Sequence, residues 1–178
     1  MTTSEFSRFF AVLSLTCGAS TLVLGVTWVA ARVRPSSGVA GLLDGVAPAA
    51  LWLAWIVAAV TTFGSLYYSE VAHFVPCKLC WYQRIAVYPL SLVLLVAALR
   101  RDGRVWTYVL PPALIGLGFA VFHTQLQAYP HTSSFCTTTE PCTARYVWEF
   151  GFVSLPFMAM TAFAGVIALV LLARRGHD

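Results

Sequence analysis

The sequence predicts an all-α integral membrane protein, built as a helical bundle of five transmembrane helices. Hydrophobic residues make up 59% of the 178 residues and only 10% are charged, against about 25% in soluble globular domains. The mean hydropathy is +0.78, and the apolar residues fall into five runs of about 20 residues, the length that crosses a bilayer. None of the runs alternates with the period of two expected of a barrel strand. A soluble enzyme is therefore excluded.

The five apolar runs are the predicted helices, and they lie at residues 9–31, 45–69, 81–99, 105–125 and 150–173. The first, second and fifth carry no charged residue. The third is apolar apart from Gln83 and Arg84, and the fourth has only His123 as an ionisable group. Membrane helices tolerate proline, so we expect kinks or helix starts rather than breaks at Pro89, Pro111, Pro112 and Pro156.

The arginine pattern predicts how the chain crosses the membrane. Seven of the eleven basic residues follow the first, third and fifth runs, and short loops rich in Arg and Lys stay in the cytoplasm. We therefore expect a multi-pass membrane protein, with its N-terminus and the loops at residues 70–80 and 126–149 outside and its C-terminus in the cytoplasm. The basic clusters are short, so nucleic acid is not an expected partner. The first run is too long for a cleaved signal peptide.

Cysteine carries the chemistry that the sequence suggests. Cys77 and Cys80 form a Cys-x-x-Cys motif directly before an apolar run. The positive end of a helix dipole stabilises a thiolate, the form that thiol exchange requires. Arg84 lies one helical turn beyond Cys80 on the same face, and an ionisable group within a membrane segment is a functional-site candidate. Cys17, alone inside an apolar run, is expected to be a small, buried and inert packing residue.

Simpler interpretations of these residues remain open. Arg84 alone is compatible with a side chain that reaches the lipid headgroups. The Cys-x-x-Cys motif is compatible with a structural disulfide, or with half of a zinc site completed by Cys136 and Cys142. Five residues separate Cys136 from Cys142 and none is histidine, which disfavours zinc. We therefore expect no metal, and this second pair suits exchange with another protein better.

One block and several separate residues form a more specific pattern. The block is Pro-Cys-x-Leu-Cys-Trp-Tyr-Gln-Arg at residues 76–84, and the other positions are Glu70, Tyr88-Pro89, His123, Glu140-Pro-Cys142, Tyr146, Phe150-Gly-Phe and Pro156. This pattern resembles the DsbB/BdbC family of quinone-dependent disulfide-bond formation proteins over about residues 50–173. Because that family has four spans, the resemblance implies a four-helix core at residues 49–178. Residues 1–48 would be an added transmembrane helix with a cytoplasmic linker.

The resemblance implies an enzyme, a thiol:quinone oxidoreductase of the bacterial cytoplasmic (inner) membrane. It would reoxidise an extracytoplasmic thioredoxin-like oxidase of the DsbA/BdbD type and pass the electrons to the quinone pool, supporting disulfide formation in exported proteins. The disulfide Cys136–Cys142 would accept the electrons, with Cys136 in the mixed disulfide, and Cys77–Cys80 would reoxidise it. Cys80 would face the quinone, and Arg84 would stabilise negative charge on the quinone oxygen or the Cys80 thiolate. The quinone is either ubiquinone or menaquinone.

The remaining polar and aromatic residues have less definite roles. The resemblance implies a quinone contact for His123, although a lone histidine at a membrane boundary is more often a packing residue. Glu70 is either a boundary charge or part of the outer site, and His73 and His131 are expected to be solvated. An aromatic cluster marks the interfacial belt or lines a quinone entry; its members are Tyr67, Tyr68, Trp81 and Tyr82.

Two other functions fit parts of the sequence. An enzyme like vitamin K epoxide reductase also couples loop cysteines to quinone, but there the shuttle pair precedes the Cys-x-x-Cys motif, whereas here Cys77 and Cys80 come first. A non-enzymatic scaffold with two permanent disulfides is the alternative outside redox chemistry. Arg84 inside a membrane segment argues against the scaffold.

Overall fold

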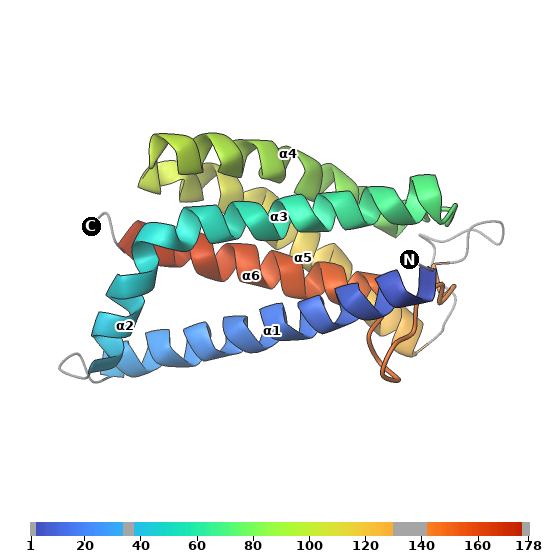
Figure 1. Ribbon diagram of the computed structural model, residues 1–178, viewed down its shortest axis with the longest axis horizontal. Coiled ribbons are helices and arrows are strands. Elements are labelled where there is room, and N and C mark those ends of the chain that lie inside the picture. Colours follow the sequence, from blue (N-terminus) through green and yellow to red (C-terminus); the bar gives the residue numbers. More distant parts are fainter. Residues whose placement is uncertain (1–2, 34–37, 130–141, 176–178) are drawn as a thin grey trace.

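The computed structural model describes residues 3–33, 38–129 and 142–175. The elements in chain order are α1 (Thr3–Val33), α2 (Gly38–Val46), the 3-10 helix η1 (Ala47–Ala49), α3 (Ala50–Leu66), the π-helical turn η2 (Tyr67–Val71), α4 (Lys78–Arg100), the 3-10 helix η3 (Gly103–Val105), α5 (Trp106–Ala128) and α6 (Leu155–Arg175). Figure 1 shows the long helices running along one bundle, in which α1 begins at one end and α6 finishes at the other.

The predicted all-α membrane bundle is confirmed. Five stretches are long and apolar enough to cross a membrane, namely Thr3–Val33, Leu43–Val71, Lys78–Arg100, Gly103–Ala128 and Leu155–Arg175. Among the described residues the only strand-like pairing is an isolated bridge between Glu149 and Val153. Helix α4 continues through Pro89, and α5 continues through Pro111 and Pro112. These prolines therefore do not break their helices, as predicted.

The last helix begins five residues later than predicted, at Leu155 instead of residue 150. Phe150 and Gly151 have φ angles of 53° and 81°, which belong to the left-handed region and cannot continue a right-handed helix. Pro156 falls in the first turn of α6, where the missing N–H has no helical partner to lose. The apolar residues just before α6 therefore form a tight turn rather than a helical turn.

Helix α6 is the centre of the bundle and packs against α1, α3 and α5, while α4 packs against α3 and α5. Small residues allow these helices to approach closely. A Cβ added at Gly116 of α5 would lie 2.4 Å from Cζ of Phe163. One added at Gly64 of α3 would lie 2.6 Å from Cε1 of Phe10 on α1.

Cys17 lies where α1 packs on α6. Its Sγ is 3.7 Å from the carbonyl oxygen of Thr161, and a Cβ added at Gly165 would lie 2.9 Å from the same sulfur. The thiol is free and the side chain is half-buried. Cys17 is thus a packing residue, but a less enclosed one than predicted.

Candidate active site

The Cys-x-x-Cys motif begins α4 at the end of the bundle where α1 starts. Cys77 is the N-cap residue, with extended backbone angles, and its carbonyl oxygen accepts a hydrogen bond from the N–H of Trp81. Cys80 lies in the first helical turn. The two sulfurs are 3.2 Å apart and both thiols are free, so this structure holds the reduced form of the pair. Cys77 is 6% exposed and Cys80 is half-buried.

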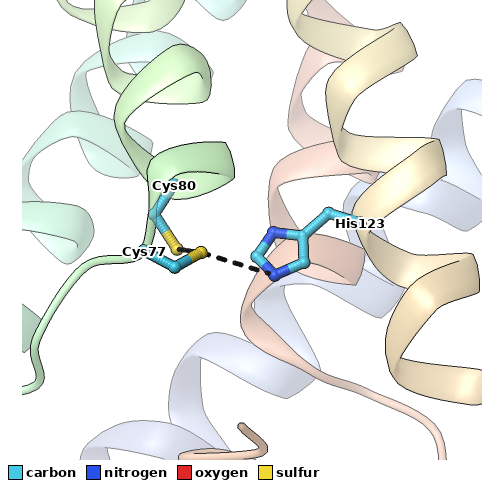
Figure 2. Close-up of side chains that lie close together, drawn as sticks. All are labelled: Cys77, Cys80 and His123. Carbon is cyan, nitrogen blue, oxygen red and sulfur yellow. Dashed lines mark hydrogen bonds between the residues drawn. The ribbon is translucent and has the colours of Figure 1, made fainter. Parts of the chain in front are cut away.

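His123 lies on the neighbouring helix α5, and its side chain points toward this pair (Figure 2). Its Nε2 lies 3.8 Å from Sγ of Cys77 and 3.0 Å from the carbonyl oxygen of Cys142. Its Nδ1 lies 3.2 Å from Nε2 of Gln83. Because an amide nitrogen only donates, Nδ1 is the acceptor and the ring proton resides on Nε2. The buried imidazole therefore donates toward both Cys142 and Cys77.

Cys77 lies just before the membrane-spanning helix α4, and the pKa of its thiol is lowered. The hydrogen bond with the Cys80 thiol lowers the pKa of Cys77 below its ordinary value. The hydrogen bond with His123 acts in the same direction, whereas burial of the sulfur opposes both. Hydrogen bonds to a thiolate favour the charged form. Cys77, the N-cap residue just before the membrane-spanning helix α4, therefore carries a thiolate.

Arg84 is held by α3 rather than by an acidic partner. Its Nε donates to Oγ of Ser65 at 2.9 Å, and its Nη2 donates to the carbonyl oxygen of the same residue at 3.0 Å. The guanidinium carbon also lies 5.3 Å from the centre of the Trp81 ring. In the described part of the chain no carboxylate pairs with this arginine. Its positive charge is thus fixed in place and available to an anionic ligand.

A cavity of about 800 Å³ lies beside these residues. Five polar or reactive side chains at its outer end are those predicted from the sequence, and the walls continue as apolar side chains of α1, α3 and α6. Residues of the outer end are Cys77, Cys80, Gln83, Arg84, His123, Gln127 and Cys142. The structure therefore brings Cys77, Cys80, Cys142, Arg84 and His123 to one cavity.

Cys142 is the member of the second cysteine pair that lies within the described residues. It is 1% exposed and shares a small buried cluster with Cys77, Leu79 and Leu126. Cys142 is disulfide-bonded. Its predicted partner, Cys136, lies outside the described residues, so the pairing Cys136–Cys142 stays a prediction, as does the pairing Cys77–Cys80.

The sulfur and nitrogen atoms of Cys77, Cys80 and His123 lie within 4.8 Å of one another, close enough for three ligands of a soft metal ion. The four-cysteine zinc site considered from the sequence needs Cys142 as a thiolate. Because Cys142 is disulfide-bonded here, that site does not form in this state.

Three supporting residues were missed as such by the sequence analysis. Gln83 was noted only as a polar residue in an apolar run, yet it orients His123; its position three residues after Cys80 places it on the same helix face. Ser65 holds Arg84 from a neighbouring helix, and no sequence pattern links the two positions. The third is Gln127. Its backbone carbonyl oxygen accepts hydrogen bonds from the Arg145 guanidinium, and its side-chain amide donates to the backbone carbonyl oxygen of Ala144.

The other candidates lie away from the cavity or have structural contacts. Glu70 is exposed and accepts a hydrogen bond from its neighbour Ser69, so it is a boundary charge. His73 is exposed, as predicted, while His131 lies outside the described residues. Trp81 and Tyr82 are 51% and 40% exposed, as in an interfacial belt.

Tyr67 and Tyr68, the other two members of the aromatic cluster, depart from that belt. Tyr68 is only 5% exposed, stacks on Phe74 and lines the cavity. Its hydroxyl donates to Oγ of Ser7 on α1. Tyr67 stacks on Phe6 of the same helix. These two tyrosines therefore connect α1 to the outer end of α3.

Comparison with known proteins decides between the remaining interpretations. The family described as disulfide bond formation protein DsbB matches residues 47–173. The chain belongs to the DsbB family. It is 43% identical over 126 residues to disulfide bond formation protein C of Bacillus subtilis, covering 70% of this chain and 91% of the relative. It is 42% identical over 123 residues to a probable disulfide formation protein C of Halalkalibacterium halodurans, covering 68% and 90%.

A third relative, a probable disulfide formation protein of Coxiella burnetii, is 43% identical over 115 residues, which cover 63% of this chain and 78% of the relative. No solved structure matches the chain. DsbB-family membership makes the chain a membrane disulfide oxidoreductase. The family match starts at residue 47, so α1 and α2 lie outside it.

Proposed function

We propose that the protein is a thiol:quinone oxidoreductase that reoxidises an extracytoplasmic thioredoxin-like oxidase of the DsbA/BdbD type. The observation that carries this proposal is the placement of the two Cys77 and Cys80 sulfurs, 3.2 Å apart, at the polar end of a cavity that Arg84 also lines. A dithiol beside a fixed cation and an apolar cavity suits electron transfer to a quinone. In this proposal residues 49–178 form the catalytic core and residues 1–48 an addition.

The first transfer is a thiol-disulfide exchange with the partner oxidase. A thiolate of the reduced partner attacks the Cys136–Cys142 disulfide, forming a mixed disulfide at Cys136 and releasing Cys142 as a thiol. The second partner thiol then resolves this bond, so the partner leaves oxidised and the loop pair reduced. Burial of Cys142 at 1% exposure supports attack at Cys136, since a protein partner cannot reach the Cys142 sulfur.

The second transfer passes two electrons between the loop pairs. Cys142 attacks the Cys77–Cys80 disulfide at Cys77, and Cys80 leaves as a thiolate. Cys136 then resolves the Cys77–Cys142 bond, which leaves Cys77 and Cys80 reduced and Cys136–Cys142 oxidised. Packing of Cys77 and Cys142 in one buried cluster supports this route. The low proton affinity of Cys77 makes it a good leaving group when Cys136 attacks.

The residues present fit a quinone as electron acceptor. A bound quinone accepts the two electrons and two protons that the dithiol releases when its disulfide reforms. Arg84 would hold an oxygen of the ring, and Cys80, half-buried on the same cavity wall, would face it. His123 would retain its proton on Nε2 and orient Cys77. The acceptor is ubiquinone or menaquinone.

We place the cysteine loops outside the bacterial cytoplasmic membrane and the C-terminus in the cytoplasm. The arginine clusters at the C-terminal ends of α1, α4 and α6 support this orientation, and thiol oxidation belongs in the compartment where disulfides persist. A phosphatase reporter fused after Arg175 is expected to be inactive. Activity of that fusion outside the membrane would contradict the orientation.

The function is tested with the purified protein in detergent, a reduced thioredoxin-like oxidase and either quinone. We expect turnover that disappears in Cys136→Ser and in Cys80→Ser. Thr107→Ser is the control, because this exposed side chain lies in the first turn of α5 and outside the cavity, and its turnover should equal that of the wild type. A protein that keeps both outer disulfides intact and reduces neither quinone would instead be a scaffold.

A further inference from the structure

We propose that α1 forms one wall of a groove that holds the isoprenoid tail of the quinone. This inference rests on the proposed function and extends it to a helix that the family match excludes. The groove is the apolar part of the cavity beside the cysteines, and side chains of α1, α3 and α6 line it. Figure 1 shows α6 running alongside both α1 and α3. The occupant to which we commit is a polyprenyl chain attached to the quinone ring.

The groove is continuous with the redox site. One cavity contains Cys80 and Arg84 at its outer end, and it extends to Leu24 of α1, Val46 before α3 and Leu169 of α6. Between Leu13 and Leu24, α1 rises about 16 Å at 1.5 Å per residue. A ligand with a polar ring and a long apolar tail matches a space with a polar end and a long apolar extension. A head group alone would leave most of it empty.

Helix α1 is fixed in the position that this wall requires. At its outer end Ser7 accepts a hydrogen bond from the Tyr68 hydroxyl at 3.3 Å, and Phe10 packs on Gly64. Arg8 lies 3.6 Å from the carboxylate of Glu149. Farther along, Gly18 and Cys17 pack on α6. Helix α1 therefore contacts the bundle on both sides of the groove.

The groove also opens toward the lipid, as a tail arriving from the bilayer requires. Leu13 and Val23 line it, yet they are 38% and 62% exposed. Helices α1 and α3 both pack on α6. A long apolar chain can therefore lie on α6 and enter sideways between α1 and α3. A phospholipid acyl chain has similar chemistry, and the experiment below separates the two.

Cys17 provides a direct probe of occupancy. The chain has five cysteines, so when both loop pairs are oxidised Cys17 is the one remaining thiol. It lines the groove. In the oxidised wild-type protein, we expect the tailed quinone to slow alkylation of Cys17 by a maleimide at least fivefold. The same head group with a methyl group in place of the tail should leave the rate unchanged within twofold.

Two variants add an independent measurement. Ser20→Trp fills the groove from α1, and we expect it to raise the ratio of the apparent KM for the tailed quinone to that for the tail-less quinone at least tenfold. Leu22→Trp adds the same side chain at a position that is 73% exposed and outside this cavity. That matched control should leave the ratio unchanged.

The outcomes separate this inference from the function on which it rests. Equal turnover of the two quinones, with no protection of Cys17, would overturn the tail site and leave the oxidoreductase intact. Equal protection by a phospholipid of matched chain length would show a lipid site instead. If neither quinone is reduced, the proposed function fails, and protection of Cys17 still reports whether the tail binds.

Discussion

The Nε2 of His123 lies 3.0 Å from the carbonyl oxygen of Cys142. The same nitrogen is 3.8 Å from the Cys77 sulfur, so a single buried imidazole connects the two cysteine loops. Gln83 fixes its tautomer from the other side of the ring. His123 is thus better described as the residue that positions one cysteine pair against the other than as a quinone contact alone.

Replacing His123 should slow transfer between the two pairs. In His123→Ala the Cys77 thiolate loses a donor and the Cys142 backbone loses an anchor. We expect the rate of electron transfer from the Cys136/Cys142 pair to fall at least about tenfold. Rapid mixing of the protein with a reduced partner, followed by acid quench and alkylation, measures that rate. His73→Ala, which changes an exposed histidine, should behave as the wild type; equal rates for all three proteins would contradict the assignment.

The thiolate of Cys77 should persist below the pH at which ordinary thiols lose their charge. Its pKa is lowered mainly by the hydrogen bond from Cys80 and further by His123. In the fully reduced protein, the alkylation rate of Cys77 should therefore stay constant as pH falls below about 8.5, the ordinary thiol value. Mass spectrometry of the Cys77 peptide measures that rate.

The matched variants for this pKa are Cys80→Ala and Cys80→Ser. Alanine removes the donor, so the Cys77 pKa should rise, whereas the serine hydroxyl still donates and should keep it lower. Because the folded pKa is depressed, the thiolate stabilises the reduced fold fully above the unfolded pKa and loses this effect as pH falls through the folded pKa. Identical pH profiles in both variants would show that Cys80 does not set the pKa.

The two-point contact between Arg84 and Ser65 should matter as much as the charge. Lysine keeps the charge but cannot reproduce the planar fork, so Arg84→Lys is expected to raise the apparent quinone KM about tenfold with a smaller change in kcat. Ser65→Ala should have a weaker effect in the same direction. Thr62→Val, on the same helix with its hydroxyl bonded to the Ala58 carbonyl oxygen and outside the cavity, is the control, and an equal effect there would contradict the contact.

The packing of α5 on α6 predicts a large stability difference between two glycines. A Cβ at Gly116 would lie 2.4 Å from the Phe163 ring, whereas one at Gly118 would have no neighbour within 4 Å. Overpacking costs about 1–3 kcal/mol, so Gly116→Ala should lower the unfolding temperature in detergent and Gly118→Ala should not. Equal melting temperatures would mean that the two helices separate without penalty.

The bundle could be predicted from the sequence because the signal is composition over a length. Runs such as residues 45–69 are uncharged, and lipid admits few other structures than a helix. The start of α6 was missed because residues 150–154 are equally apolar, while the turn depends on the backbone angles of Phe150 and Gly151. Hydropathy does not report backbone angles.

The site was predictable in part for a related reason. Cys77, Cys80 and Arg84 are neighbours on one helix, so spacing alone places them together. Ser65 and the Cys142 carbonyl come from other elements, and only the packing of α3, α4 and α5 brings them to Arg84 and His123. The groove beside α1 depends on three helices, and no local pattern in any of them indicates it.

The most direct test of the central claim is a single turnover without any partner. The fully reduced protein is mixed anaerobically with one equivalent of quinone, and the thiols of each cysteine peptide are counted as quinol forms. We predict one quinol for every disulfide gained, counted over the Cys77/Cys80 and Cys136/Cys142 pairs together, and no quinol from Cys80→Ser. Quinol formation that continues in Cys80→Ser, or none in a wild type whose thiols remain reduced, would contradict the account.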